Sequence, residues 1–342
     1  LEKDLIAAKA IKNIAVDVDQ GTVDVLLGYP AKGWQGKRAE LLKEKITAAG
    51  AKNVTVRIET KIDSYSVQKG VKPIPNVKNI IAIASGKGGV GKSTVAVNLA
   101  LALSAEGATV GILDADIYGP SQPSMLGVKM KPESKDGKTL EPITSYHLQA
   151  MSIGFLIDEE TPMIWRGPMV TQALEQLLRD TNWKDVDYLI IDLPPGTGDI
   201  QLTLAQKVPV TGAAIVTTPQ DIALLDARKG LKMFEKVEIP VLGVIENMSI
   251  HICSKCGHEE YIFGSGGGQK MADDYDVDFL GSLPLDIRIR EDTDAGKPTV
   301  AADPECRISH IYRDIARRIA ARLSLKKKDF AGKFPSIVIQ NT

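Results

Sequence analysis

The hydrophobic pattern of the first 65 residues predicts a small α+β domain. Apolar and polar positions alternate over IAVDVDQGTVDVLLGY (14–29), where a Gln-Gly pair marks a hairpin-like turn, and again over NVTVRIET (53–60). Helical spacing predicts an opening helix over residues 5–11 and a second helix over 38–50, with a glycine at its carboxyl end. The predicted order is therefore helix, strand, strand, helix, strand.

From residue 79 the pattern changes to short, nearly continuous apolar runs, which are typical of strands buried on both faces of a parallel sheet. The runs are NIIAIAS, TVGILDAD, DYLIIDLP, GAAIVTTP, PVLGVIEN and VDFLGSLP. Helical stretches alternate with them, so residues 79–325 are predicted to form an α/β domain with a doubly wound, mostly parallel sheet. We interpret 66–78 as a linker, 129–146 as a surface excursion and 326–342 as a carboxyl-terminal tail.

Composition favours a globular protein of a reducing compartment. The 342 residues are 44% hydrophobic and 25% charged, and the formal net charge of −1 gives no electrostatic reason to expect nucleic acid or an anionic membrane as a partner. Three cysteines are too few for a disulfide framework. No apolar run approaches the roughly 20 residues that span a bilayer. We therefore expect a cytoplasmic protein that binds neither nucleic acid nor a membrane.

A complete phosphate-loop pattern, G-x-x-x-x-G-K-S, lies directly between a predicted strand and a predicted helix. Glycines there let backbone N–H groups point at phosphate oxygens, and the positive end of the helix dipole adds to the attraction. We expect Lys92 to contact the β- and γ-phosphates and the Ser93 hydroxyl to bind Mg²⁺. The predicted nucleotide-binding residues of the loop are Gly86, Lys87, Gly88, Gly89, Val90, Gly91, Lys92, Ser93 and Thr94.

Acidic residues stand at the carboxyl ends of two later strands, where open α/β sheets bind their ligands. Asp114 and Asp116 lie in ILDADIYGPS, and Asp192 lies in LIIDLPPGTGD. We expect Asp192 to hold Mg²⁺ directly or through water, and the Gly196 N–H to contact the γ-phosphate. Asn247 is a candidate base contact, and the lack of an Asn-Lys-x-Asp pattern, whose aspartate reads guanine, favours adenine and hence ATP.

Cys253 and Cys256 form a Cys-x-x-Cys pair, which gives two of the four ligands of a tetrahedral metal site. The chain has no second such pair, and Cys306 stands alone in a predicted helix. In a two-fold dimer the partner supplies the second pair, and four thiolates suit either a [4Fe–4S] cluster or Zn²⁺. His251 and His258 flank the pair as further candidate zinc ligands, and a redox pair or a simple turn is the remaining interpretation.

The phosphate loop resembles that of the deviant-Walker ATPases, the group that includes MinD, ParA, the arsenical pump ATPase and the nitrogenase iron protein. Their pattern K-G-G-x-G-K-S/T matches residues 87–93. The resemblance implies that Lys87 crosses a homodimer interface and neutralises charge on the partner's nucleotide where the γ-phosphoryl group leaves. It also implies that Asp116, which matches the switch-I aspartate, positions or activates the attacking water. Lys87, Lys92 and Asp116 are therefore the predicted catalytic residues.

From residue 79 to about 325 the chain resembles the Mrp/ApbC family of ATP-dependent iron–sulfur cluster carriers. The resemblance rests on SGKGGVGKST, DADIYGPS, WRGPM, DLPPGTGD, ENMS and the Cys-Ser-Lys-Cys stretch. It implies an ATPase that uses Mg²⁺, binds a [4Fe–4S] cluster across a homodimer and transfers it to apo iron–sulfur proteins, with cluster-assembly scaffold proteins as further partners. Residues 1–65 resemble the metal–sulfur cluster assembly domain often fused ahead of this ATPase. Their loop GYPAKGWQGK lacks the cysteine that such domains often carry, so docking is the expected role.

Three other functions fit part of the pattern. A MinD- or ParA-like positioning switch uses the same ATP dimer to bind membrane or DNA. A positioning switch gives no role to the cysteine pair. Stable membrane anchoring needs an apolar segment in addition to positive charge, and no such segment accompanies the lysines at 326–328. A reductase like the nitrogenase iron protein shares the bridged cluster and requires it to change charge with turnover. A zinc-bridged dimeric ATPase shares the thiolate count. The cluster carrier uses every motif, and it is the function we expect.

Overall fold

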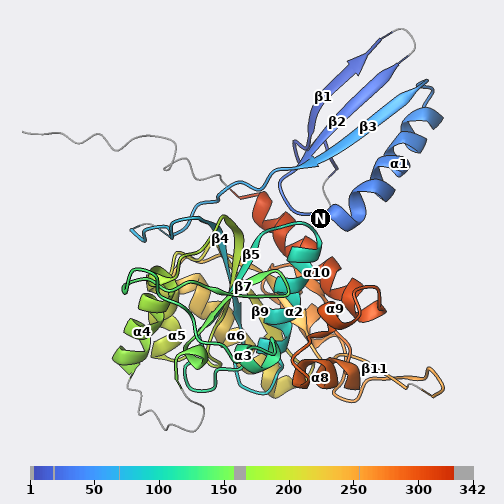
Figure 1. The fold of residues 1–342 in the computed structure, drawn as a ribbon. Coiled ribbons are helices and arrows are strands. Elements are labelled where there is room, and N and C mark those ends of the chain that lie inside the picture. Colours follow the sequence, from blue (N-terminus) through green and yellow to red (C-terminus); the bar gives the residue numbers. More distant parts are fainter. Residues whose placement is uncertain (1–3, 18–19, 69, 158–166, 254, 327–342) are drawn as a thin grey trace, which may run out of the picture.

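Two main sheets follow each other along the chain, one of three strands and one of eight, and a small two-stranded sheet accompanies the second (Figure 1). The computed structural model describes residues 4–17, 20–68, 70–157, 167–253 and 255–326. The predicted tail beyond Lys326, and Trp165 and Arg166 of the WRGPM stretch, lie outside the described residues. None of the helices in these described ranges combines the length and the apolar composition needed to cross a membrane.

The large sheet confirms the predicted α/β fold. Its strands lie in the order β13-β10-β9-β4-β8-β5-β7-β6, and every neighbouring pair is parallel except β6 and β7. The six predicted apolar runs all form strands of this sheet. The strands are β4 (Val77–Ala84), β5 (Val110–Asp114), β6 (Ile143–Ser145), β7 (Leu148–Ser152), β8 (Val186–Asp192), β9 (Gly212–Thr217), β10 (Val241–Glu246) and β13 (Phe279–Ser282).

The hairpin of β6 and β7 was not predicted. Its two-residue turn consists of Tyr146 and His147, which both have positive φ, 47° and 64°. Turns of this kind usually contain Asn or Gly, so the sequence carries no turn signal at this point. As a result, residues 143–145 of the predicted surface excursion instead form the edge strand of the sheet.

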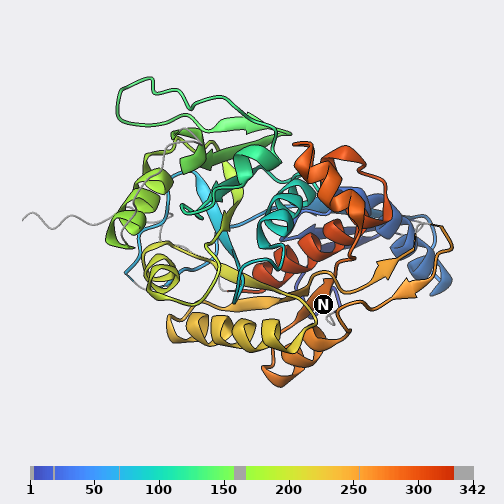
Figure 2. The same ribbon diagram turned by 90° about the horizontal axis from the view of Figure 1, so that it is seen from below.

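Helices cover both faces of the large sheet (Figures 1 and 2). One face packs against α2 (Lys92–Ala105), α9 (Thr299–Ala302) and α10 (Arg307–Ser324). The other packs against α4 (Gly167–Asp180), α5 (Asp199–Lys207), α6 (Asp221–Lys236) and α7 (Gly267–Asp274). Three short helices, α3 (Gln122–Met125), η1 (Ile153–Phe155) and α8 (Ile287–Asp294), complete this part of the fold.

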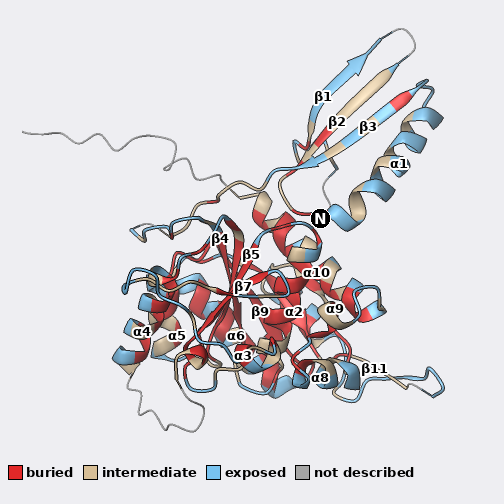
Figure 3. Cartoon of the chain, viewed as in Figure 1, coloured by how far each residue is buried: buried red, intermediate tan, exposed pale blue. Residues whose placement is uncertain are grey.

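Burial follows from the apolar spacing of the helices. In α10 the residues Ile308, Tyr312, Ile315 and Ile319 recur every three or four positions and face the core. Helix α2 is apolar on nearly all sides, because it lies between the sheet and α10. Figure 3 shows this contrast: the large sheet and α2 are buried, whereas the three-stranded sheet and its helix are mostly exposed or half-buried.

The amino-terminal unit contains β1 (Ile11–Val16), β2 (Gly21–Leu27), α1 (Lys32–Ala48) and β3 (Val54–Thr60). β1 and β2 form the predicted antiparallel hairpin, and β3 pairs with β2 in parallel. Helix α1 begins six residues before its predicted start and ends just before Gly50, as expected. The boundaries of the predicted domains stay predictions. Strand β4 begins at Val77, two residues before the predicted start of the α/β domain at residue 79.

The predicted opening helix is wrong. Residues 5–9 form a single turn, in which the Asp4 carboxylate accepts the N–H groups of Ile6 and Ala7 at 2.8 and 2.7 Å. Lys9 then adopts a left-handed conformation, with φ of 53°, which ends the turn. Ile11, the last residue of the predicted apolar face, is the first residue of β1. The spacing that favoured a helix is produced by a turn followed by a strand.

A buried glutamate joins this unit to the large sheet. Glu106, at the carboxyl end of α2, accepts hydrogen bonds from the guanidinium groups of Arg313 (2.9 Å) and Arg317 (2.5 Å) on α10. Its second oxygen accepts the Gly33 N–H at 3.0 Å, at the amino end of α1, where the helix dipole favours negative charge. A Cβ at Gly33 would lie 2.4 Å from the Arg313 guanidinium, so a larger residue there would displace the arginine that pairs with Glu106.

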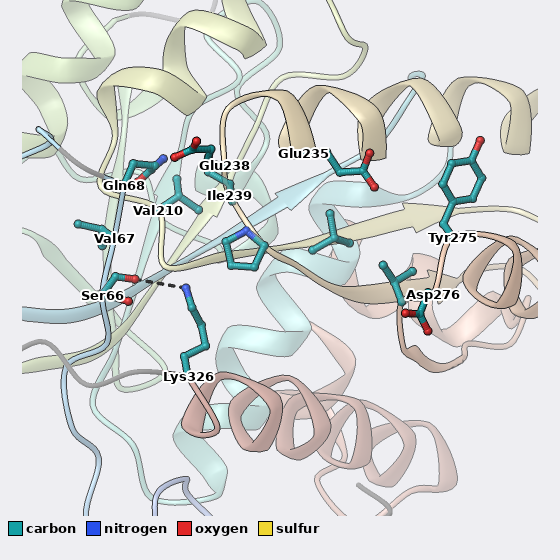
Figure 4. Close-up of a pocket in the computed structure, with 13 residues that line it drawn as sticks. Ser66, Val67, Gln68, Val210, Glu235, Glu238, Ile239, Tyr275, Asp276 and Lys326 are labelled. Atoms are coloured by element: carbon teal, nitrogen blue, oxygen red, sulfur yellow. Dashed lines mark hydrogen bonds between the residues drawn. The ribbon is translucent and has the colours of Figure 1, made fainter.

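The linker is held against the amino-end edge of the large sheet, beside a cavity of about 600 Å³ (Figure 4). The Lys326 ammonium donates to the carbonyls of Ser66 (3.2 Å) and Thr211 (2.5 Å), and the Gln68 amide donates to the carbonyl of Ala205 (2.9 Å). Burial lowers the pKa of Lys326 to about 8. The segment interpreted as a linker is therefore fixed at two points, to α5 through Gln68 and to the loop before β9 through Lys326.

Replacement of Glu106 tests the junction. We expect Glu106→Gln to lower the free energy of unfolding by about 3 kcal/mol, because it removes the buried counter-charge that two partly buried arginines share and leaves them only the exposed carboxylates of Glu305 and Asp314. Urea denaturation measures the change. Glu44→Gln, on the exposed side of α1, is the matched control and should stay within about 0.5 kcal/mol of the wild type. Equal stability of the two variants would show that the junction contributes little.

Candidate functional site

The phosphate loop lies between β4 and α2, as predicted. Gly89 and Gly91 have φ of 83° and 81°, in the left-handed region that favours glycine. A Cβ at Gly86 would lie 2.1 Å from the backbone of Asp226 in α6, so this glycine allows the loop and α6 to touch. The local backbone therefore has the shape that a glycine-rich phosphate cradle requires.

Lys92 is the first residue of α2, and its ammonium is buried. It donates to the Asp192 carboxylate and, at 3.2 Å, to the Ser93 hydroxyl. Asp192 is the last residue of β8 and is fully buried, so the sheet brings together the predicted phosphate and magnesium residues. Contact of Lys92 with a nucleotide phosphate stays a prediction. It requires the ammonium to exchange Asp192 for the phosphate, which would keep the buried cation paired in both states.

Asp114 organises the segment that carries Asp116. Its carboxylate accepts the N–H groups of Asp116 (3.1 Å), Ser121 (2.9 Å) and Gln122 (3.0 Å). It also accepts the Ser152 hydroxyl at 3.2 Å. Burial and, next, the charge of Asp192 raise the pKa of Asp114 to about 7. Asp114 therefore shapes the loop after β5 and is itself inaccessible.

Asp116 lies in that loop and is half-buried. Burial raises the pKa of its carboxyl group, and the positive charge of Lys92 opposes the shift. A carboxylate with a raised pKa is a better proton acceptor than an ordinary aspartate. The environment of Asp116 is thus suited to the predicted role beside the attacking water, which stays a prediction.

Two further predicted residues lie against the phosphate loop, and the predicted catalytic Lys87 lies within it. The Asn247 amide donates to the Val90 carbonyl at 2.8 Å, so its side chain supports the loop, and base contact stays a prediction. The Gly196 N–H donates to the Ser85 carbonyl at 3.0 Å, and contact with a γ-phosphate requires this bond to break. Within the described part of the chain, the Lys87 ammonium is paired with no carboxylate, which leaves its charge available for another partner.

The cysteine pair lies at the tip of a short hairpin formed by β11 (His251–Ile252) and β12 (Glu259–Glu260). The Cys253 N–H donates to His258 at 2.9 Å, and the Gly257 N–H donates back to Cys253 at 2.8 Å, with Gly257 at φ of 71°. The backbone N–H groups of Cys256 and Lys255 lower the pKa of the Cys253 thiol. Since the thiolate is the form that binds metal, this turn favours metal binding by Cys253.

The flanking histidines do not complete a metal site within one chain. The His251 ring nitrogen Nδ1 is 3.0 Å from the Leu285 carbonyl, and the His258 side chain is largely exposed. Among the residues that the structure describes, no group of three or more His, Cys, Asp or Glu side chains is arranged to hold a metal ion. A tetrahedral site at Cys253 and Cys256 therefore needs ligands beyond the side chains that the structure describes.

One residue of the site was missed by the sequence analysis. Gln122, the first residue of α3, is buried, and its amide nitrogen donates to both Asp192 (2.9 Å) and the Ser93 carbonyl (3.1 Å). Gln122 belongs to none of the motifs that the sequence analysis used. Its only sequence signal is its position directly after DADIYGPS. Gln122 connects the loop after β5 with the phosphate loop and the end of β8.

Family comparison agrees with this arrangement. Residues 76–320 match the family described as ParA: NUBPL iron-transfer P-loop NTPase. The chain belongs to this family. The predicted resemblance to iron–sulfur cluster carriers of the P-loop group is confirmed, and so is the predicted fold class.

Relatives of this NUBPL-family chain share most of its length. The iron-sulfur cluster carrier protein of Escherichia coli K12 is 53% identical over 329 residues, which cover 94% of this chain and 88% of that protein. The iron-sulfur cluster transfer protein NUBPL of Mus musculus is 50% identical over 254 residues, which cover 74% of this chain and 80% of that protein.

Solved structures show the same fold. A nucleotide-binding protein of Archaeoglobus fulgidus, in complex with ADP, has a TM-score of 0.60 at 36% identity. The match covers 68% of this chain and 90% of the Archaeoglobus chain. The cell division ATPase MinD of Pyrococcus furiosus has a TM-score of 0.53 at 23% identity, over 70% of this chain and 98% of its own. The second likeness concerns the fold alone.

The raised pKa of Asp114 predicts a pH-dependent stability. Between its ordinary value of 3.8 and about 7, the folded protein holds a proton that the unfolded chain has lost. The free energy of unfolding therefore falls as pH rises through this window. Without nucleotide and Mg²⁺, the melting temperature of the wild type should fall more steeply between about pH 5 and pH 7.5 than that of Asp114→Asn.

Asp136→Asn is the control for this comparison. Asp136 is exposed, and hydrogen bonds from the Thr139 and Lys138 N–H groups lower its pKa, so it does not titrate in this window. The control should keep the wild-type slope. The same slope in Asp114→Asn as in the wild type would contradict the assignment.

Proposed function

We propose that this chain is an ATPase that carries a [4Fe–4S] cluster between two copies of itself and transfers it to apo iron–sulfur proteins. One observation supports the proposal above all others. The phosphate loop follows β4 and the cysteine hairpin follows β10, so both lie beyond the carboxyl-end edge of one parallel sheet. Asn247 links them, since it contacts Val90 of the loop and precedes the cysteine hairpin by only a few residues.

The nucleotide site has the residues that ATP and Mg²⁺ need. Lys92 and the loop N–H groups provide positive charge and donors for the phosphates, and Ser93 and Asp192 provide oxygen ligands for Mg²⁺. Mg²⁺ bound with the nucleotide supplies charge that neutralises the β- and γ-phosphates. Asp116 positions or activates the attacking water, and hydrolysis is coupled to cluster loading or transfer.

The dimer supplies what a single chain lacks. Lys87 has no carboxylate partner among the described residues, and across a two-fold axis it reaches the nucleotide of the partner subunit. Exposed apolar side chains accompany the cysteine hairpin: Tyr261 and Ile262 follow it, and Ile222 and Leu225 lie on the amino-terminal half of α6. These side chains give the interface apolar surface to bury beside the cluster.

The cluster is the cargo in this proposal. Each chain brings Cys253 and Cys256, and two chains bring the four thiolates that a cubane cluster binds. The hairpin is exposed, so the cluster can reach an acceptor protein. Scaffold proteins are the partners that provide the cluster, and the amino-terminal unit is a docking element.

The alternatives explain less. The two relatives described above, at 53% and 50% identity, carry the names of a cluster carrier and a cluster transfer protein, whereas the likeness to MinD, at 23% identity, concerns the fold. A positioning switch also gives no role to the cysteine hairpin. A zinc-bridged dimer differs from the proposal only in the metal, and metal analysis separates the two.

The two loop lysines should have separable effects. We expect Lys87→Ala to reduce ATP hydrolysis by about 10²- to 10³-fold and leave nucleotide affinity nearly unchanged, because Lys87 acts from the partner subunit. Lys92→Ala should impair both. Phosphate release and binding of a fluorescent ATP analogue give the two quantities. An equal loss of affinity in both variants would make Lys87 an ordinary phosphate ligand.

Iron stoichiometry tests the cluster proposal. Anaerobic reconstitution should give about two irons per chain, since one four-iron cluster is shared by two chains. Cys253→Ala and Cys256→Ala should each abolish stable binding, because each removes two of the four ligands from the symmetric site. Absorbance spectra and iron analysis measure both results.

Cys306→Ala is the matched control. Cys306 is the N-cap of α10, where its sulfur accepts the Ser309 N–H at 3.4 Å, and the variant should bind iron like the wild type. ATP hydrolysis should persist in all three cysteine variants. Four irons per chain, dependence on Cys306, or preferential binding of zinc from an equal mixture would contradict the proposal.

A further inference from the structure

Gln122 has a buried polar atom that no described residue satisfies. Its side chain is 1% exposed, and its amide oxygen Oε1 has no hydrogen-bond partner within the described part of the chain. Buried amide oxygens in folded proteins are nearly always paired, so an unpaired one next to a ligand site indicates an absent water or ion.

The orientation of this amide is fixed by its neighbours. Both contacts of Nε2, the Asp192 carboxylate and the Ser93 carbonyl, are acceptors. A flipped amide would place oxygen against oxygen at both positions, so the nitrogen must face them. The unpaired Oε1 shares a carbon with that nitrogen and therefore lies close to Ser93 and Asp192.

Ser93 and Asp192 are the residues that hold Mg²⁺ in the proposed function. Mg²⁺ in nucleotide sites keeps several of its waters, and these waters are hydrogen-bond donors. A carboxamide oxygen is an acceptor and cannot donate. The one unsatisfied atom of Gln122 therefore complements the hydration shell of a Mg²⁺ ion held by its two neighbours.

We propose that Gln122 is a positioning residue for Mg²⁺: Oε1 accepts a hydrogen bond from the hydration shell of the ion, while Nε2 orients Asp192. This inference rests on the proposed nucleotide site. It differs from a purely structural role, because a residue that only joins α3 to β8 needs no acceptor at Oε1. Partners of this kind, one shell beyond the ligands, contribute about 10- to 100-fold to metal affinity.

The test compares metal affinity with nucleotide affinity. Gln122→Met keeps the length of the side chain and removes both polar atoms. Electron paramagnetic resonance of Mn²⁺, a substitute for Mg²⁺, should show about tenfold weaker Mn²⁺ binding to the ADP complex of this variant. ADP affinity measured by calorimetry in EDTA should remain within about twofold of the wild type. Gln149→Met is the control. Gln149 lies at the amino end of β7, where its amide pairs with the backbone of Lys184, and the variant should match the wild type in both affinities.

A second measurement guards against a simple folding defect. Without nucleotide and metal, Gln122→Met should keep the wild-type circular dichroism spectrum, so a weaker Mn²⁺ affinity reports the lost acceptor and not a misfolded site. Wild-type Mn²⁺ affinity in Gln122→Met overturns the inference, as does an equal loss of ADP affinity with and without metal. If the wild-type chain itself binds no ADP, the proposed nucleotide site is wrong. If the wild type binds ADP and Gln122→Met keeps the wild-type Mn²⁺ affinity, only the role of Gln122 is wrong.

Discussion

The buried ion pair between Lys92 and Asp192 is the interaction on which the site depends. It exists because three neighbouring parallel strands end at one level: Ile83 of β4 is in register with Asp192 of β8, and Asp192 is in register with Asp114 of β5. The cost of burying these charges is offset only while each has a partner. The sheet therefore creates a position where the ammonium must bind an anion, whether a protein carboxylate or a phosphate.

The sequence predicted the parts of this site that are local. The glycine loop and the strand-end aspartates follow directly from short motifs, since backbone shape and strand ends are properties of a few adjacent residues. Gln122 was missed because its function arises from contacts with Ser93 and Asp192, which the fold brings from distant segments. The two wrong expectations have local causes instead. Asp4 caps a single turn that Lys9 ends, and the Tyr146-His147 turn lacks the Asn or Gly that usually marks such a turn.

The Glu106 junction places the amino-terminal unit at the opposite end of α2 from the phosphate loop. The 14 residues of α2 separate the two by about 21 Å. Both ends carry a buried charge, Lys92 at one and Glu106 at the other, and neither can move without breaking an ion pair. Figure 1 shows the small sheet projecting from the end of the molecule opposite to α3 and α8. The amino-terminal unit is thus attached to the helix that begins at the phosphate loop, although it lies far from the nucleotide.

The cysteine hairpin differs from the rest of the sheet domain in how little holds it together. Only two residue pairs, His251 with Glu260 and Ile252 with Glu259, form its ladder, and Glu259 and Glu260 are exposed. Segments with so few buried contacts open locally at a small fraction of the global unfolding free energy, and their amides exchange rapidly with solvent. The two apolar cores do not include the hairpin, so its opening leaves them intact. In the proposed function, the thiolates would therefore bind and release their cargo through local fluctuation, while the large sheet stays folded.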